Sequence, residues 1–163
     1  MKRRVRGDES LIQRRIGRVA PNILCICVDG AENGVSYRLY HCYAGEPVCF
    51  SEIGELLLRA DGIFDETRYP QASTESRTFG RKQEEKTPRP AVRERTKLMS
   101  ENEVTSQRGD KATFVVHVQY RQNATWQGSV VWAEKNKTQR FRSALELLKL
   151  IDSALDESSI KEE

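Results

Sequence analysis

The sequence predicts an α+β fold in which a ββ(β)α unit occurs twice in tandem and forms an intramolecular pseudo-dimer. Three observations lead to this class. Two segments of the chain match each other without a gap, each contains apolar stretches with the period of a strand, and each ends in an amphipathic helix. We expect the strands to form one antiparallel sheet, or two abutting sheets, with both helices on one face.

The internal match is the strongest of these observations. When residues 23–66 are moved along the chain by 91 positions, they fall on residues 114–157. Identical residues at matched positions include Phe50 and Phe141, Leu56 and Leu147, Asp61 and Asp152, and Asp65 and Asp156. A unit of this size is marginal as a free-standing domain. We therefore expect the two copies to pack on each other, or alternatively two chains to exchange halves as a domain-swapped homodimer.

The match divides the chain into five parts. Residues 1–18 form a basic flexible N-terminus, 19–66 the first repeat, 67–112 a charged disordered linker, 113–157 the second repeat and 158–163 a polar tail. The linker combines prolines with many charges, and such a composition buries too little apolar surface to offset its ordering entropy. Tyr69 and Phe79 are the side chains through which its first part could contact the fold.

The first strand of each unit has one face that is apolar in both copies. We expect these strands at 23–28 and 114–120, where alternate side chains share a face. The face in question carries Ile23, Cys25 and Cys27 in the first unit, and Phe114, Val116 and Val118 at the matched positions of the second. The opposite face becomes polar in the second copy. The Cys25/Cys27 face is therefore the predicted face of the shared core.

A turn and further strands follow in each unit. Asn33-Gly34 is a strong hairpin signal, and residues 121–125 replace this turn in the second unit. The second strands are expected at 35–43 and 126–134, where either face fits the pattern. Leu39 and its match Val130 favour one face, whereas Tyr40 and its match Val131 favour the other. A third short strand is expected near 47–50 and 138–141.

Each unit ends in a helix with one apolar stripe. The stripes consist of Ile53, Leu56, Leu57, Ala60, Ile63 and Phe64, and of Ala144, Leu147, Leu148, Ile151, Ala154 and Leu155. Ser143 and Glu146 form the pattern of a capping box. The second helix also has Leu145 and Leu150 outside its stripe. This extra apolar surface is either buried by packing between the halves or a second docking face.

Composition and charge favour a cytoplasmic protein. The net charge is only +3, which is too small to indicate a strongly anionic partner by itself. The basic N-terminus has no apolar run behind it, so it does not read as a secretory signal. No segment reaches the ~18 apolar residues that a membrane helix needs. The four cysteines are expected to stay reduced in the cytosol.

No pattern of catalytic or metal-binding residues emerges. Cys25, Cys27, Cys42 and Cys49 with His41 do not follow a common zinc spacing. Three of these cysteines match Val116, Val118 and Ala133 in the second copy, which favours a role as small core residues. His41 and His117 lack an acid, Ser or Cys partner at a motif spacing. We therefore expect no enzymatic activity, no metal and no cofactor.

Two features remain as candidates for binding. Asp61 with Asp65, and Asp152 with Asp156, are carboxylates four residues apart that share a helix face. They are either solvated or paired with an arginine, for which Arg59 and Arg142 are the nearest candidates, or they form a docking surface for a basic partner, which could be the linker of the chain itself.

The second candidate is the turn between the strands of the second unit. Its amides, hydroxyl and indole suit recognition of a ligand or a protein partner. The predicted binding residues are Arg121, Gln122, Asn123, Thr125, Trp126 and Gln127. The alternative is a turn whose side chains bond their own backbone.

Nucleic acid is the alternative partner. The basic residues of the N-terminus and of the stretch 81–97 could contact phosphates, although interleaved glutamates weaken that field. Binding of nucleic acid often adds aromatic side chains on which bases stack. Trp126 and Trp132 are the candidates for such a role.

The run R-Q-N-A-T-W-Q-G-S-V-V-W-A-E, followed by F-R-S-A-L-E-L-L-K-L-I-D-S-A-L, resembles a family of short uncharacterised bacterial proteins. The resemblance covers residues 114–157, with 23–66 as a diverged internal copy. It implies a bacterial cytosolic protein but no particular activity. We therefore expect a non-enzymatic binding or adaptor protein, with a nucleic-acid-associated regulator as the alternative and an enzyme of unrecognised type as the third reading.

Overall fold

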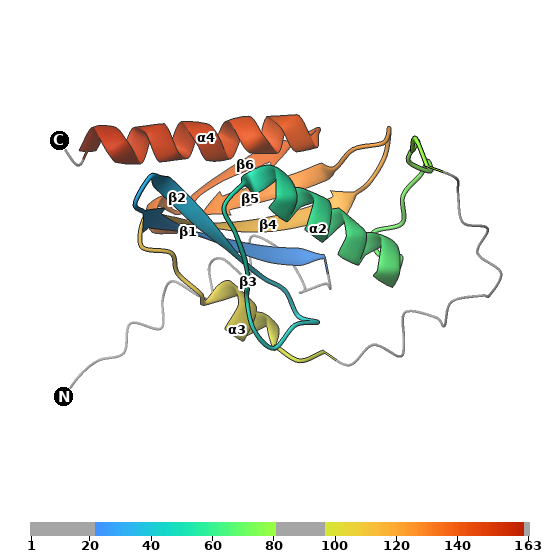
Figure 1. Cartoon of the computed structure of the whole chain (residues 1–163), viewed down its shortest axis with the longest axis horizontal. Coiled ribbons are helices and arrows are strands. Elements are labelled where there is room, and N and C mark those ends of the chain that lie inside the picture. Colours follow the sequence, from blue (N-terminus) through green and yellow to red (C-terminus); the bar gives the residue numbers. More distant parts are fainter. Residues whose placement is uncertain (1–21, 81–96, 162–163) are drawn as a thin grey trace.

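The computed structural model describes residues 22–80 and 97–161 (Figure 1). The predicted basic N-terminus and residues 81–96 of the predicted linker lie outside the described residues. In the described part, the elements in chain order are β1 (Ile23–Ala31), β2 (Gly34–Tyr40), β3 (Val48–Phe50), α2 (Ile53–Thr67), α3 (Glu101–Thr105), β4 (Ala112–Tyr120), β5 (Gln127–Trp132), the short 3-10 helix η2 (Ala133–Lys135), β6 (Lys137–Phe141) and α4 (Ala144–Lys161). The α+β class is confirmed, and the expected third strands are present as β3 and β6.

The described strands form one six-stranded antiparallel sheet in the order β3-β2-β1-β4-β5-β6. β1 and β4 lie side by side at its centre, where Cys25 is opposite Val115 and Leu24 is opposite Val116. The strands of residues 23–50 therefore continue directly into those of residues 112–141 within one chain. Of the two arrangements that the sequence leaves open, the structure has the single sheet.

The main hydrophobic core contains side chains of the sheet and of both long helices. From β1 it takes Leu24, Ile26 and Val28, and from β4 Phe114, Val116 and Val118. The helices add Leu56, Leu57, Ala60 and Phe64 from α2, and Leu147, Ile151 and Ala154 from α4. These helix residues belong to the predicted apolar stripes. Leu150 packs partly against this core, whereas Leu145 is exposed.

The predicted core face of β1 is wrong. Cys25 and Cys27 are fully buried, but they belong to a second, smaller cluster on the opposite face of the sheet. That cluster also contains Ile23, Val115, Val131, Tyr40 and Val104 of α3. Of the two faces left open for the second strands, Leu39 and Val130 point into the main core, while Tyr40 and Val131 do not.

A β-bulge in β4 explains this error. Val118 is opposite Gly128 and Tyr120 is opposite Gln127, so Gln119 is an extra residue without a partner on β5. One extra residue in a strand reverses which face every residue before it points to. The core residues of β4 therefore lie 90 positions after those of β1, although the rest of the match keeps a distance of 91. An ungapped comparison cannot register such an insertion.

The predicted disordered linker, 67–112, contains ordered structure at both ends. At its C-terminal end α3 has a complete capping box, in which the Ser100 hydroxyl accepts from the Glu103 backbone and the Glu103 carboxylate accepts from the Ser100 backbone. Val104 and the partly buried Met99 then cover the Cys25/Cys27 face. Burial of these apolar side chains offsets the entropy cost of ordering this segment. The prediction of disorder rested on the overall composition of the linker and did not include this contact.

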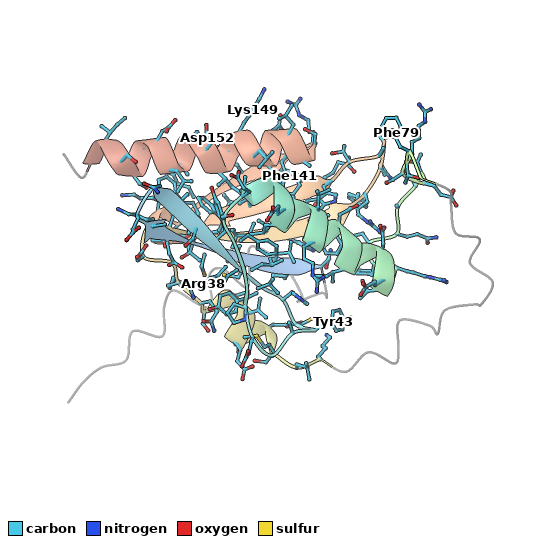
Figure 2. The ribbon with its side chains drawn as sticks, viewed as in Figure 1. Arg38, Tyr43, Phe79, Phe141, Lys149 and Asp152 are labelled. Carbon is cyan, nitrogen blue, oxygen red and sulfur yellow. The ribbon has the colours of Figure 1, made fainter. Side chains whose placement is uncertain are left out.

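The helix of the second unit also differs from the prediction at both of its ends. Helix α4 continues through most of the predicted tail and ends at Lys161. At its start the Ser143 hydroxyl accepts a hydrogen bond from the Glu146 backbone at 3.0 Å, as expected for half of a capping box. The Glu146 carboxylate bonds to Arg142 instead of Ser143. Figure 2 shows Lys149 on the outer side of this helix.

Gly128 is essential to the bulge. An added Cβ would lie 1.9 Å from the carbonyl oxygen of His117, an atom of the backbone that cannot move away. We expect Gly128→Ala to lower the free energy of unfolding by about 3 kcal/mol, at the upper end of overpacking costs.

The matched control is Gly62→Ala in α2, where a Cβ meets no atom within 4 Å. There the better helix propensity of alanine should raise stability by about 1 kcal/mol. Urea unfolding of both variants measures the two changes, and a neutral Gly128→Ala would contradict the proposed role of this glycine.

Candidate partner-binding groove

The loop 121–126 joins β4 to β5 and docks onto helix α2. The bulge at Gln119 sets its direction, because it places Arg121 on the helix side of the sheet and leaves Tyr120 on the other side, 57% exposed. Without the extra residue, strand alternation would point Arg121 away from α2. Bulges commonly re-aim a side chain in this way.

Arg121 is almost completely buried, with 4% of its surface exposed. Its Nε donates to the carbonyl oxygen of Pro70 at 2.7 Å, and one terminal nitrogen donates to Asp65 at 2.6 Å and to Asp61 at 3.2 Å. Its guanidinium also lies 5.7 Å from the centre of the Phe64 ring. A buried charge is stable only when it is paired and hydrogen-bonded, and these contacts meet that condition.

The same interaction accounts for the acidic pair of α2. Asp61 and Asp65 are paired with an arginine, as one of the sequence alternatives has it, but the partner is Arg121 and not the predicted Arg59 or Arg142. Arg142 instead pairs with Glu146 in the first turn of α4. The second acidic pair, Asp152 and Asp156, is exposed.

Trp126 is a core residue and not an exposed recognition group. It is 3% exposed and packs edge-on against Phe64, with the ring centres 5.4 Å apart. Its indole Nε1 donates to Asp61 at 2.8 Å. Trp132 is buried as well, at 7% exposure. Neither indole is therefore available to stack on a nucleobase in this structure.

Most of the other predicted binding residues use their polar groups within the protein. The Gln127 amide bonds both the N–H and the carbonyl of Gln122, each at 2.9 Å. The Thr125 hydroxyl accepts from the backbone of Ala144 at 2.9 Å and so attaches the loop to the start of α4. Asn123 is exposed, with a positive φ of 55° at the tip of the loop. The Thr125 and Gln127 side chains therefore have the bonding of an internally satisfied turn, whereas Gln122 takes part through its backbone and its side chain is exposed.

A groove of about 950 Å³ runs beside this loop. One wall is formed by α2, through Gly54, Leu57, Leu58, Asp61 and Asp65, and by Arg68, which follows the last residue of that helix. The facing walls are the loop, the start of α4 and residues 72–76, which are held in place by a parallel bridge between Ala72 and Arg121. Phe79, which the sequence suggested as an anchor of this segment, is fully exposed and lies far out on its loop (Figure 2).

The two ends of the groove differ in chemistry. At one end Leu58 is 76% exposed between small residues such as Ala144 and Gly54. At the other end the side chains of Asp61 and Asp65 remain 37% and 58% exposed, although each gives one oxygen to Arg121. The lining as a whole has three acidic side chains, Asp61, Asp65 and Glu75, and two basic ones, Arg68 and Arg121, so the groove has a net negative charge.

The remaining reactive side chains do not gather around the groove. The Cys25 and Cys27 sulfurs lie 3.9 Å apart beneath α3, where the hydrogen bond to Cys27 and burial raise the pKa of the Cys25 thiol well above its ordinary value. Burial lowers the pKa of His117, whose Nδ1 has no hydrogen-bond partner. Within residues 22–80 and 97–161, no three His, Cys, Asp or Glu side chains are grouped as metal ligands. None of the described helices could cross a membrane.

Removing charge from the two sides of the ion pair should have unequal effects. Asp61→Asn with Asp65→Asn keeps the shape but leaves the buried Arg121 charge unbalanced, and we expect a loss of roughly 3 kcal/mol. Arg121→Met leaves carboxylates that water can reach, so we expect a smaller loss of roughly 1 kcal/mol. Guanidinium unfolding of the three proteins measures the difference. Equal losses would show that burial of the guanidinium does not control this site.

Comparison of the chain with protein-family models, with curated proteins and with solved structures gives no match. The resemblance to a bacterial family therefore stays an expectation from the sequence. The sequence singled out Asp61, Asp65, Arg121, Thr125 and Trp126 of the lining and assigned Leu57 and Ala144 to the apolar stripes, but it did not single out Leu58 or residues 72–76. Only the position of Leu58 and Asp61 along one edge of the apolar stripe of α2 could have indicated a second surface.

Proposed function

We propose that the protein is a non-enzymatic binding or adaptor protein of the bacterial cytosol, and that the groove beside α2 binds its partner. The observation that carries this proposal is the groove, which is large enough for a ligand and has Leu58 at 76% exposure on its wall. It lies where α2 meets the loop 121–126, on the seam between the two halves. The four cysteines are free of disulfides, which suits a reducing compartment.

The fixed floor of the groove supports a binding role. Arg121 ties the loop to α2 and to Pro70, and Thr125 ties it to α4. Walls that are held in place before binding lose little entropy when a partner arrives. An exposed leucine on a rigid wall then offers apolar area that a partner can bury at about 25 cal/mol per Å².

The chemistry of the lining favours binding over catalysis. The lining contains neither His nor Cys, and two of its three carboxylates, those of Asp61 and Asp65, are already paired with Arg121. A general acid or base must be within reach of the proton that it transfers and free to exchange it. Carboxylates held against a buried guanidinium suit recognition of charge better than proton transfer.

We also propose that the two halves derive from one duplicated ββ(β)α unit and form a pseudo-dimer with α2 and α4 on one face of the sheet. Support comes from the matched order of elements, from the antiparallel pairing of β1 with β4, and from the shared core of the two helices. The bulge at Gln119 then reads as a later insertion into the second copy.

The insertion can be tested by deleting Gln119. Because the deletion leaves Val118 opposite Gly128 and Tyr120 opposite Gln127, every side chain keeps its face. The collision at Gly128 involves the backbone of His117 and Gln119, which lies at and just before the bulge, so a regular register there should relieve it. In a double-mutant cycle by urea unfolding, we expect Gly128→Ala to cost at least about 1 kcal/mol less in the deletion variant. Additive effects would contradict the insertion.

Partner binding is tested by selection from a displayed library of random heptapeptides. We expect peptides that bind the wild-type protein and lose at least about tenfold in affinity to Leu58→Asp, because a charge replaces apolar contact area at the wall of the groove. Ile160→Asp is the matched control, since Ile160 is 75% exposed on α4 and lies outside the groove. Peptides that bind Leu58→Asp as well as Ile160→Asp would remove the groove as the site.

A further inference from the structure

We infer that the partner of the groove is a short extended peptide segment with an apolar and a basic side chain two residues apart. This inference rests on the proposed function, and it assigns the chemistry that the groove selects. Three properties of the groove carry it: the spacing of Leu58 and the two aspartates along α2, the net negative charge of the lining, and the small space between its walls.

The spacing follows from the positions of Leu58 and the two aspartates on α2. Leu58 lies three residues before Asp61 and seven before Asp65. At 1.5 Å per residue, the middle of the acidic pair is about 7 to 8 Å along the helix from Leu58. In an extended chain, residues i and i+2 point to the same side and lie about 6.6 Å apart. One apolar and one basic side chain at these positions can therefore reach both ends together.

The charge at the acidic end favours a cation. Asp61 Oδ1 accepts from both Arg121 and Trp126, and Asp65 Oδ1 accepts from Arg121. All of these bonds use the Oδ1 atoms, which we call the inner oxygens, and the Oδ2 atoms are the outer ones. Both carboxylates line the groove and remain partly exposed. A lysine or arginine of the partner can bind the outer oxygens without displacing Arg121. Such a contact offsets the net negative charge of a lining in which three carboxylates outnumber two guanidinium groups.

The size of the groove favours an extended segment over a helix. A volume of about 950 Å³ is that of a site for a few residues. Helices shorter than roughly 12 residues are marginal in water and would have to form at the moment of binding. The wall opposite α2 has one residue in a bridge, Ala72, and next to it the Ser73 N–H donates to the Arg121 carbonyl at 3.0 Å.

The heptapeptide selection also tests this inference, because the sequences of the enriched peptides show which side chains the groove selects and at what spacing. We expect enriched peptides to have Leu, Ile, Val, Met or Phe two positions from Lys or Arg. A labelled peptide from this set should bind Asp65→Asn at least about fivefold more weakly than the wild type, because the outer contact loses its charge while Arg121 keeps an acceptor. Glu66→Gln, a neighbouring charge change outside the groove lining, is the control. Thermal unfolding verifies that both variants are folded.

Each other outcome has a separate meaning. Peptides that depend on Leu58 but lack a basic residue, and bind Asp65→Asn as well as the wild type, would overturn this inference and leave the proposed function standing. A basic residue enriched at a spacing of three or four would overturn the extended conformation in favour of a helix. A failure to enrich any peptide, together with a dimer that Leu58→Asp dissociates, would overturn both proposals and make a second copy of the chain the occupant.

Discussion

The buried guanidinium of Arg121 is the interaction on which the second half of the molecule depends for its attachment to α2. Its charge cannot be removed by deprotonation in a protein, so the fold must supply acceptors wherever it is buried. Those acceptors come from two carboxylates of α2 and from the carbonyl of Pro70, which follows that helix. One side chain, directly after β4, thereby connects α2, the chain that follows α2 and the loop 121–126. The same contacts make the floor of the groove rigid.

The bulge in β4 is what makes this interaction geometrically available. Gln119 has no partner on β5, so the alternation of side chains between the two faces of the sheet is reversed between Val118 and Tyr120. Arg121 therefore lies on the side of the sheet that faces α2. Gly128 is the complementary change on β5, because only a residue without a Cβ fits against the His117 carbonyl. The first hairpin has no register shift and closes through a two-residue turn at Glu32 and Asn33, since Ala31 is paired with Gly34. The groove therefore depends on the bulge, which only the second of these two hairpins has.

Local patterns in the sequence predicted the strands and the long helices because periodicity depends only on neighbouring residues. The core face of β1 was predicted wrongly because it was inferred by comparison with β4, whose phase the bulge reverses. The partner of Asp61 and Asp65 was missed for a related reason. Arg59 and Arg142 were chosen by their nearness to the helices in sequence, while Arg121 is brought to Asp65 from 56 residues away by strand pairing. Helix α3 had a readable signal in Ser100 and Glu103, but the composition around it obscured that signal.

The polar loop that the sequence singled out shows why polar composition alone is an ambiguous sign of binding. Amides, hydroxyls and an indole in one loop must be hydrogen-bonded whether or not a ligand is present. Here the Gln127 side chain accepts from the Gln122 backbone, the Thr125 hydroxyl accepts from the Ala144 backbone and the Trp126 indole donates to Asp61. These bonds hold the loop that forms one wall of the groove. The proposed binding surface consists of what this bonding does not use, namely the partly exposed carboxylates of Asp61 and Asp65 and the exposed Leu58. Exposure in the structure, and not polar chemistry in the sequence, is therefore the basis of that proposal.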